Sequence, residues 1–170
     1  QLLTGNLNGT YNIICFVAAF ALIPLALKIG AKGVHFIALL LGGLSLIAMP
    51  YLDNTTVLLT IPNPVGSDIV ISTIYLYALG LGIAWASMLA MPYQLLAGSI
   101  PAKKRGVYMG IFNMFIVIPM IIQIFSMQYF VYDLLGTNPS NVITLAGVFL
   151  VLGAVFTLLI TVKNKNEVVD

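Results

Sequence analysis

The chain has 170 residues, of which 61% are hydrophobic and only 7% are charged, and its formal net charge is +2. A soluble domain carries about 25% charged residues, so this composition excludes a water-soluble globular fold and predicts a membrane protein. The single cysteine, Cys15, lies in an apolar run. It excludes a disulfide framework and a cysteine metal site, and we interpret it as a small buried hydrophobe.

Five uncharged stretches are long enough to cross a bilayer, which takes about 20 residues of helix. They are apolar at both odd and even positions and about twice as long as a barrel strand, which favours helices over a β-barrel. The expected fold class is therefore all-α integral membrane, with five transmembrane helices. We place them at about residues 10–27, 34–52, 69–100, 107–132 and 141–162.

The connecting segments separate the charged residues onto two sides. Threading the helices alternately puts Asp53, Asp68 and Asp133 on one side and all seven cations on the other. These cations are Lys28, Lys32, Lys103, Lys104, Arg105, Lys163 and Lys165. Because cytoplasmic loops carry the excess of Lys and Arg, we expect a protein of the cytoplasmic (plasma or inner) membrane. Its N-terminus would lie outside and its C-terminus in the cytoplasm.

The third expected helix raises a problem of length. At 1.5 Å per residue, residues 69–100 would reach about 48 Å, whereas the apolar core of a bilayer measures about 30 Å. This helix would have to tilt, bend at Pro92 or project into the cytoplasm. The segment before it, 53–68, reads "DNTTVLLTIPNPVGSD" and is expected to be an outer loop that can hold a short extended pair.

Polar side chains are concentrated in the first, third and fourth expected helices. Since buried polar groups normally face protein or a wet cavity, these three helices are expected to line a cavity and the other two to face lipid. They carry Asn12, Trp85, Ser87, Tyr93, Gln94, Asn113, Gln123 and Gln128. Small residues at Gly82, Ala86 and Ala90, and at Gly106 and Gly110, predict close helix packing.

Trp85 lies near the middle of its helix, away from the membrane surface where tryptophans gather. It is either a packing residue whose N–H finds a partner or an aromatic platform for a ligand such as a sugar ring. Asn113 and Gln123 lie on one helical face. Their amides would either bind hydroxyl-rich substrates or hydrogen-bond neighbouring helices, and for Asn113 we favour the second interpretation.

Ionisable residues give a negative result. No Asp, Glu, Lys or Arg lies within an expected helix, and His35 is close to a loop. The sequence also lacks paired carboxylates, a metal-ligand cluster, a phosphate-binding loop and a nucleophile–base pair. We therefore expect no enzyme, no cofactor, no metal and no nucleic-acid partner.

Two long blocks resemble a known family. "GLGIAWASMLAMPYQLL" followed by "IPAKKRGVYMGIFNMFIVIP" is similar to the tenth and eleventh helices of a branch of the major facilitator superfamily. That branch contains the sucrose and maltose proton symporters and is related to the glycoside–pentoside–hexuronide transporters. "LALKIGAKGVHFIALLLGGLSLI" is similar to the eighth-to-ninth connection of the same proteins.

The resemblance implies that residues 1–170 are a C-terminal bundle corresponding to helices 8–12 of a twelve-helix transporter, whose N-terminal half is absent from this chain. It implies proton-coupled symport of a di- or oligosaccharide by alternating access, with coupling residues in the other half. Trp85, Gln123, Asn113 and Asn12 would bind the sugar. Tyr93, Lys103, Lys104 and Arg105 would form the cytoplasmic gate.

Two alternatives remain open at this point. One is a sodium-coupled carrier of a glycoside or of another polar solute. The other is a membrane component that does not transport, such as a sensor or an assembly subunit.

Overall fold

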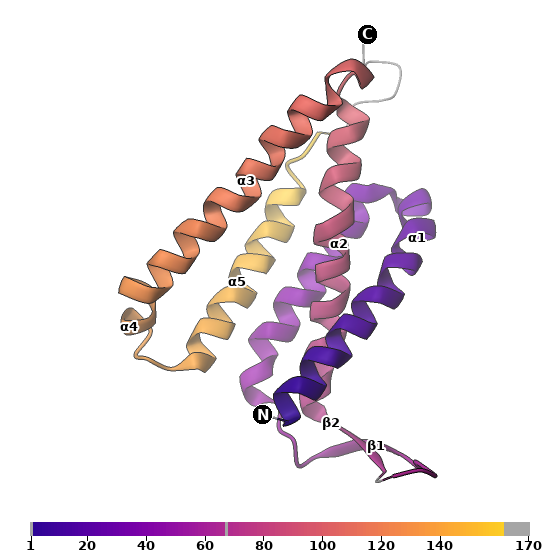
Figure 1. The fold of residues 1–170 in the computed structure, drawn as a ribbon, viewed down its shortest axis with the longest axis vertical. Coiled ribbons are helices and arrows are strands. Elements are labelled where there is room, and N and C mark those ends of the chain that lie inside the picture. The colour runs from indigo at the N-terminus through magenta and orange to yellow at the C-terminus, as the bar shows by residue number, and fades with distance from the viewer. Residues whose placement is uncertain (1, 67, 162–170) are drawn as a thin grey trace.

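The computed structural model describes residues 2–66 and 68–161, and the fold is mostly helical (Figure 1). Its main helices and strands follow one another in a simple order. They are α1 (Leu2–Ala48), β1 (Val57–Ile61), β2 (Ile69–Ser72), α2 (Leu76–Ser99), α3 (Arg105–Ser126), α4 (Tyr132–Leu134) and α5 (Pro139–Thr157).

Four helices of the described chain are long and apolar enough to cross a membrane. They cover Leu3–Tyr51, Thr73–Ser99, Arg105–Leu134 and Pro139–Thr157. Together with the composition, they indicate an integral membrane protein. Four such helices are found where five were expected, because the first two expected helices, 10–27 and 34–52, are joined across a kink in α1.

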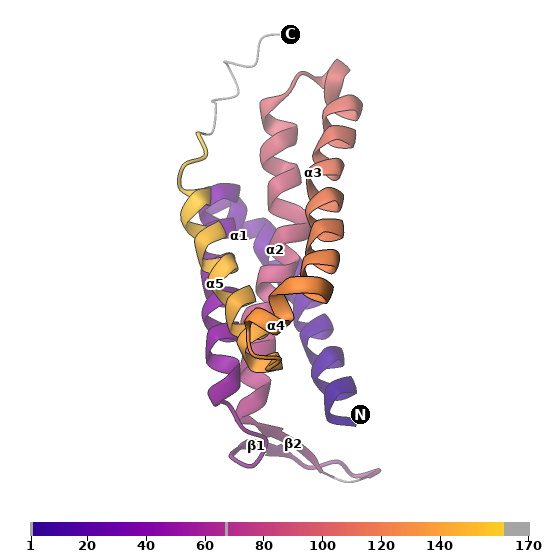
Figure 2. The same cartoon turned by 90° about the vertical axis from the view of Figure 1, so that its left-hand side faces the viewer.

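Helix α1 is bent at one residue. Gly30 has a φ of 79° and a ψ of 153°, which are not helical values, and glycine adopts positive φ without the steric cost that a Cβ brings. The bend creates a first arm, residues 2–29, and a second arm, residues 31–48. Figures 1 and 2 both show the second arm returning alongside the first in the opposite direction.

The start of the third expected helix is also corrected. Residues Ile69–Ser72 form strand β2, which pairs antiparallel with β1, and Ile61 lies opposite Ile69. Consecutive β-branched residues favour this extended conformation. Helix α2 therefore begins only at Leu76 and has 24 residues. At 1.5 Å per residue its length is about 36 Å, close to the thickness of a bilayer core, and Pro92 lies within it without ending it.

The last two expected helices, 107–132 and 141–162, are found with different ends. Helix α3 is followed by one π-helical turn, Met127–Val131, and by the short helix α4. Helix α5 begins at Pro139, and the Asn138 side chain caps it by accepting a hydrogen bond from the Ser140 N–H at 3.0 Å. Residue 162 lies outside the described chain.

Glycines allow α2 and the two arms of α1 to pack closely. A Cβ on Gly82 would lie 2.8 Å from the Tyr11 carbonyl oxygen of the first arm, and one on Gly80 would lie 2.7 Å from the Leu41 carbonyl oxygen of the second. The small-residue seam is confirmed at Gly82 and Ala86, which are buried, whereas Ala90 is exposed.

The second arm of α1 was expected to face lipid. Instead it contacts α2 through Gly42, near Ala84, and α5 through Gly43, near Gly147. The distribution of polar side chains could not predict these contacts, because they are made by two adjacent glycines, each of which packs against a different helix.

Helix α3 lies apart from the rest of the bundle along most of its length (Figure 1). None of its residues, all of which are described, is buried. At Gly106 and Gly110 the space that a Cβ would fill is open, so these glycines do not support the close packing that their spacing predicted.

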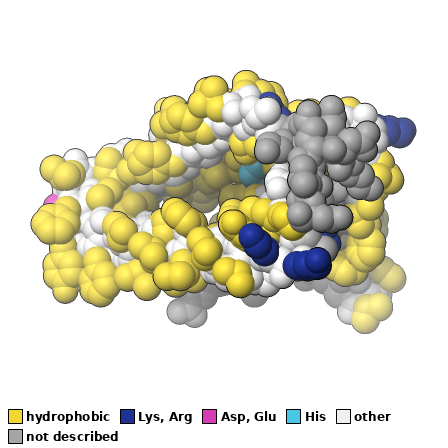
Figure 3. Space-filling model, turned by 90° about the horizontal axis from the view of Figure 1, so that it is seen from above, with side chains coloured by type: hydrophobic (Ala, Val, Ile, Leu, Met, Phe, Trp, Pro, Cys, Tyr) yellow, Lys and Arg dark blue, Asp and Glu magenta, His cyan; other side chains and the backbone are white. Residues whose placement is uncertain are grey.

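Charges gather at the two ends of the molecule. The bend of α1 and the α2–α3 connection, which carry Lys28, Lys32 and 103–105, lie at the upper end of Figure 1, here called the basic end. The β1–β2 pair and α4, with Asp53, Asp68 and Asp133, lie at the lower, acidic end. Figure 3, which looks onto the basic end, shows Lys and Arg side chains around a hollow. The expected sorting of charges is therefore confirmed for the described residues, whereas Lys163 and Lys165 lie outside them.

Candidate functional site

Trp85 projects from a face of α2 that the chain leaves partly uncovered. Its side chain is 44% exposed, although the adjacent Ala84 and Ala86 are buried. The indole N–H makes no hydrogen bond with any residue that the structure describes. The packing interpretation expected such a partner, so the geometry leaves this N–H and the ring available to a ligand.

Tyr93 and Asn113 join α2 to α3 near the basic end. The Tyr93 hydroxyl donates a hydrogen bond to Asn113 Oδ1, and the Tyr93 ring meets Phe112 edge to face with centroids 5.1 Å apart. The interhelical interpretation of Asn113 is thereby confirmed. Its role in binding a substrate stays a prediction.

Gln123 and Asn12 lie in different surroundings. Gln123 lines a cavity of about 720 Å³ between the end of α3 and the start of α5, together with Gln128 and Tyr132. Asn12 is exposed on the first arm of α1, and its side-chain N–H donates to the Asn8 carbonyl oxygen at 2.7 Å. The four expected substrate-binding residues are therefore spread over three helices, and the described hydrogen bonds do not connect them.

The expected gate residues lie at the basic end. Lys103 and Lys104 belong to a short 3₁₀ turn, Ala102–Lys104, and Arg105 begins α3. All three side chains are exposed, and the Lys104 N–H closes the turn by donating to the Pro101 carbonyl oxygen at 3.0 Å. This arrangement suits membrane anchoring and a gate equally well.

A buried polar pair, His35 and Ser87, was missed at the sequence level. His35 is 8% exposed and Ser87 is 0% exposed, and His35 Nδ1 lies 2.9 Å from Ser87 Oγ. His35 also lines a recess of about 370 Å³ between α1, α2, α3 and α5. The signal that could have found the pair is the position of Ser87 directly after Ala86 of the small-residue seam.

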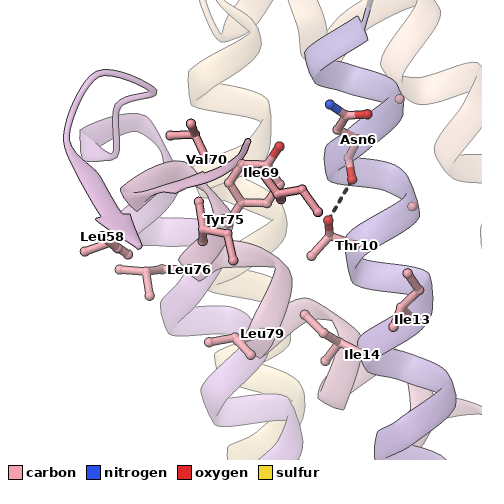
Figure 4. Close-up of a pocket in the computed structure, with 13 residues that line it drawn as sticks. Asn6, Thr10, Ile13, Ile14, Leu58, Ile69, Val70, Tyr75, Leu76 and Leu79 are labelled. Atoms are coloured by element: carbon pink, nitrogen blue, oxygen red, sulfur yellow. Dashed lines mark hydrogen bonds between the residues drawn. The ribbon is translucent and has the colours of Figure 1, made fainter. Parts of the chain in front are cut away.

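A further cavity, of about 680 Å³, opens near the acidic end between the first arm of α1, β2 and the start of α2 (Figure 4). Ile14 and Leu79 lie where the two helices approach each other. The Thr10 hydroxyl is already engaged, donating to the Asn6 carbonyl oxygen at 2.8 Å. None of the residues lining this cavity is charged or belongs to the expected sugar site. The lining of this cavity would therefore accommodate apolar groups rather than an ion.

The described residues contain no cluster of three or more His, Cys, Asp or Glu side chains that could hold a metal ion. No protein family, no curated protein and no solved structure matches this chain.

Proposed function

We propose that this chain is the C-terminal part of a secondary active sugar transporter of the major facilitator type, a proton symporter for a di- or oligosaccharide. One observation carries the proposal. In the middle of an apolar helix, Trp85 keeps 44% of its surface exposed and has an indole N–H without a partner among the described residues. An aromatic face attracts the polarised C–H groups of a sugar ring, and the N–H can donate to a hydroxyl.

The proposed topology has five crossings. The Gly30 bend lets α1 cross twice, since residues 31–48 rise about 27 Å and the first arm is longer. The separation of charge between the two ends supports a cytoplasmic basic end and an N-terminus outside. None of the residues of α3 is buried. One face of this helix would therefore contact lipid, and another face would contact the other half of the transporter.

In this proposal the sugar-binding residues surround a central path. Trp85 stacks on a sugar ring while Gln123, Asn12 and Asn113 bind hydroxyl groups. Tyr93 and the turn at 103–105 belong to the cytoplasmic gate. The Tyr93–Asn113 bond supports this role, because it closes α3 onto α2 at the basic end.

The test is sugar uptake by the complete transporter carrying Trp85→Ala, compared with Leu89→Ala. Leu89 lies one turn further along α2 and is 60% exposed, so its loss controls for removing an apolar side chain. Loss of a stacking contact of about 1–1.5 kcal/mol predicts roughly tenfold weaker apparent affinity for Trp85→Ala, with normal membrane insertion. Leu89→Ala should transport normally.

Equal uptake by both variants would remove Trp85 from the site. Uptake measured with and without a sodium gradient, across a pH series, separates proton from sodium coupling. Absence of uptake for every sugar tested, with the protein correctly inserted, would favour a component that does not transport.

A further inference from the structure

His35 lies where four helices meet. Its own helix is the second arm of α1, and its recess is also lined by Pro92 and Leu95 of α2, Phe112 of α3 and Phe156 of α5. Phe112 is the residue whose ring contacts Tyr93, next to the Tyr93–Asn113 bond. The recess therefore adjoins the contact that holds α3 on α2.

The imidazole is buried but reachable from one side. Of its two nitrogens, Nδ1 is paired with Ser87, whereas Nε2 has no partner among the residues that the structure describes. The chain has a single histidine, and Figure 3 shows its side chain at the bottom of a hollow when the molecule is viewed from the basic end. Among the described residues, the ring is therefore approached from the basic end.

We propose that His35 is a proton-binding site, reached from the basic end, that controls the docking of α3 on α2. In the proposed resting state the ring is neutral and carries its proton on Nδ1, which donates to Ser87 Oγ, so that the Nε2 lone pair faces the recess. A proton from water adds to Nε2 and gives an imidazolium with two N–H donors. The new donor draws water into the recess, between the ring and Phe112, and α3 is released.

Among the residues that the structure describes, the groups around His35 supply no negative charge. On its own helix, Lys32 lies three residues earlier, and its ammonium group is bound to the Leu158 and Ile160 carbonyl oxygens at the edge of the recess. On α2 the facing polar group is the Ser87 hydroxyl, and on α3 the lining residue is Phe112. On α5 the facing polar group is the Thr157 hydroxyl, which donates a hydrogen bond to the Gly153 carbonyl oxygen. A cation at His35 therefore has no carboxylate among the described lining residues and must be hydrated instead.

Histidine is the side chain whose ordinary titration falls between pH 5 and 8. Because no described carboxylate stabilises the cation at His35, the switch would operate toward the acidic end of that range. The inference does not require a sugar substrate. It would hold for any function in which α3 moves, and its failure would leave the proposed sugar site at Trp85 untouched.

The test uses the full chain in lipid bilayers. Because His35 is the single histidine, ¹⁵N-histidine labelling reports its tautomer and protonation state without any mutation. In parallel, spin labels at Leu89→Cys and Phe125→Cys, in a Cys15→Ala background, measure the distance between α2 and α3. We expect an Nδ1–H tautomer at high pH and a larger label distance at low pH, with the same midpoint for both signals.

Replacing His35 with glutamine, which cannot titrate, should abolish the pH dependence of the label distance. As a matched control, Ser99→Ala removes a hydroxyl of α2 that is exposed and bonded only within its own helix, and it should leave the response unchanged. The proposal is overturned if the ring does not titrate between pH 5 and 8. The proposal is also overturned if, in the protein that retains His35, the distance between the spin labels does not change with pH. It is overturned as well if that distance changes with a midpoint different from that of the ring's titration.

Discussion

Gly43 of α1 and Gly147 of α5 lie so close together that a Cβ on either would come within 2.7 Å of the carbonyl oxygen of the other. This reciprocal contact brings two backbones together without intervening side chains. In lipid, where burying apolar side chains offers little advantage, such close approach is a main source of helix association. It explains why α5, which follows the loosely attached α3, still packs on the bundle.

The first prediction follows from this contact. Gly147→Ala places its Cβ 2.9 Å from the Ile47 backbone nitrogen as well, so the helices must move apart. We expect a loss of about 1–3 kcal/mol in the free energy of unfolding, measured for the full chain in detergent micelles by circular dichroism. The control is Gly110→Ala, where the space is open and helix propensity should give a gain of up to about 1 kcal/mol. The same sign for both variants would contradict the proposed role of the contact.

The second prediction concerns the bend. With φ at 79° and ψ at 153°, Gly30 lies in a region that residues with a Cβ rarely enter, so Gly30→Ala should cost about 1–3 kcal/mol. Gly33→Ala, three residues later, would make only an ordinary contact of 3.7 Å with Ile29. Crosslinking between the arms should fall for Gly30→Ala only, when it is measured with cysteines at Leu22 and Val34, two members of one buried cluster, in a Cys15→Ala background. Equal crosslinking in both variants would show that the bend does not depend on this glycine.

These contacts also show what the sequence could and could not predict. Length and apolarity located the helices because lipid leaves the backbone few alternatives. They could not show that the first two expected helices are joined directly at a kink, because the sequence "KIGAKG" is compatible with either a loop or a kinked helix. They also could not separate Ile69–Ser72 from α2, because a continuous apolar run does not distinguish strand from helix.

The candidate site illustrates the same limit. Trp85 and Asn113 were singled out because polar or amphipathic groups are unusual in an apolar helix. His35 was set aside because it lies close to the loop expected between residues 27 and 34, yet four helices converge around it. Depth within a bundle depends on which helices pack together, and that information is not contained in any single segment. The four-residue spacing of Gly106 and Gly110 likewise could not reveal that, among the described residues, nothing lies within 4 Å of the space that a Cβ would fill at either glycine.

The third prediction concerns the end of α5. The Lys32 ammonium group donates to the Leu158 and Ile160 carbonyl oxygens at 2.8 and 2.7 Å, where the helix leaves its last carbonyls without partners. A cation at this end also complements the helix dipole. Lys32→Met, which keeps the length of the side chain, should cost about 1 kcal/mol and speed amide exchange in the last turn of α5. Lys28→Met changes an exposed lysine on the other side of the Gly30 bend and should change neither quantity. A similar effect of both variants would show that the result reflects overall charge.

The fourth prediction is a pH dependence at the acidic end. The Asp53 carboxylate accepts hydrogen bonds from the backbone N–H and the hydroxyl of both Thr55 and Thr56, which lowers its pKa from 3.8 to about 2. Because the folded pKa is the lower one, the stabilisation is fully present above about pH 4 and is lost as the pH falls through 2. The amide resonances of Thr55 and Thr56 should therefore shift with a midpoint near pH 2, and Asp53→Asn should remove the transition. Asp133→Asn, which changes another exposed acid at the same end, should leave it intact. A midpoint near 3.8, the unperturbed value, would mean that the Thr55 and Thr56 hydrogen bonds to the carboxylate are not kept in solution.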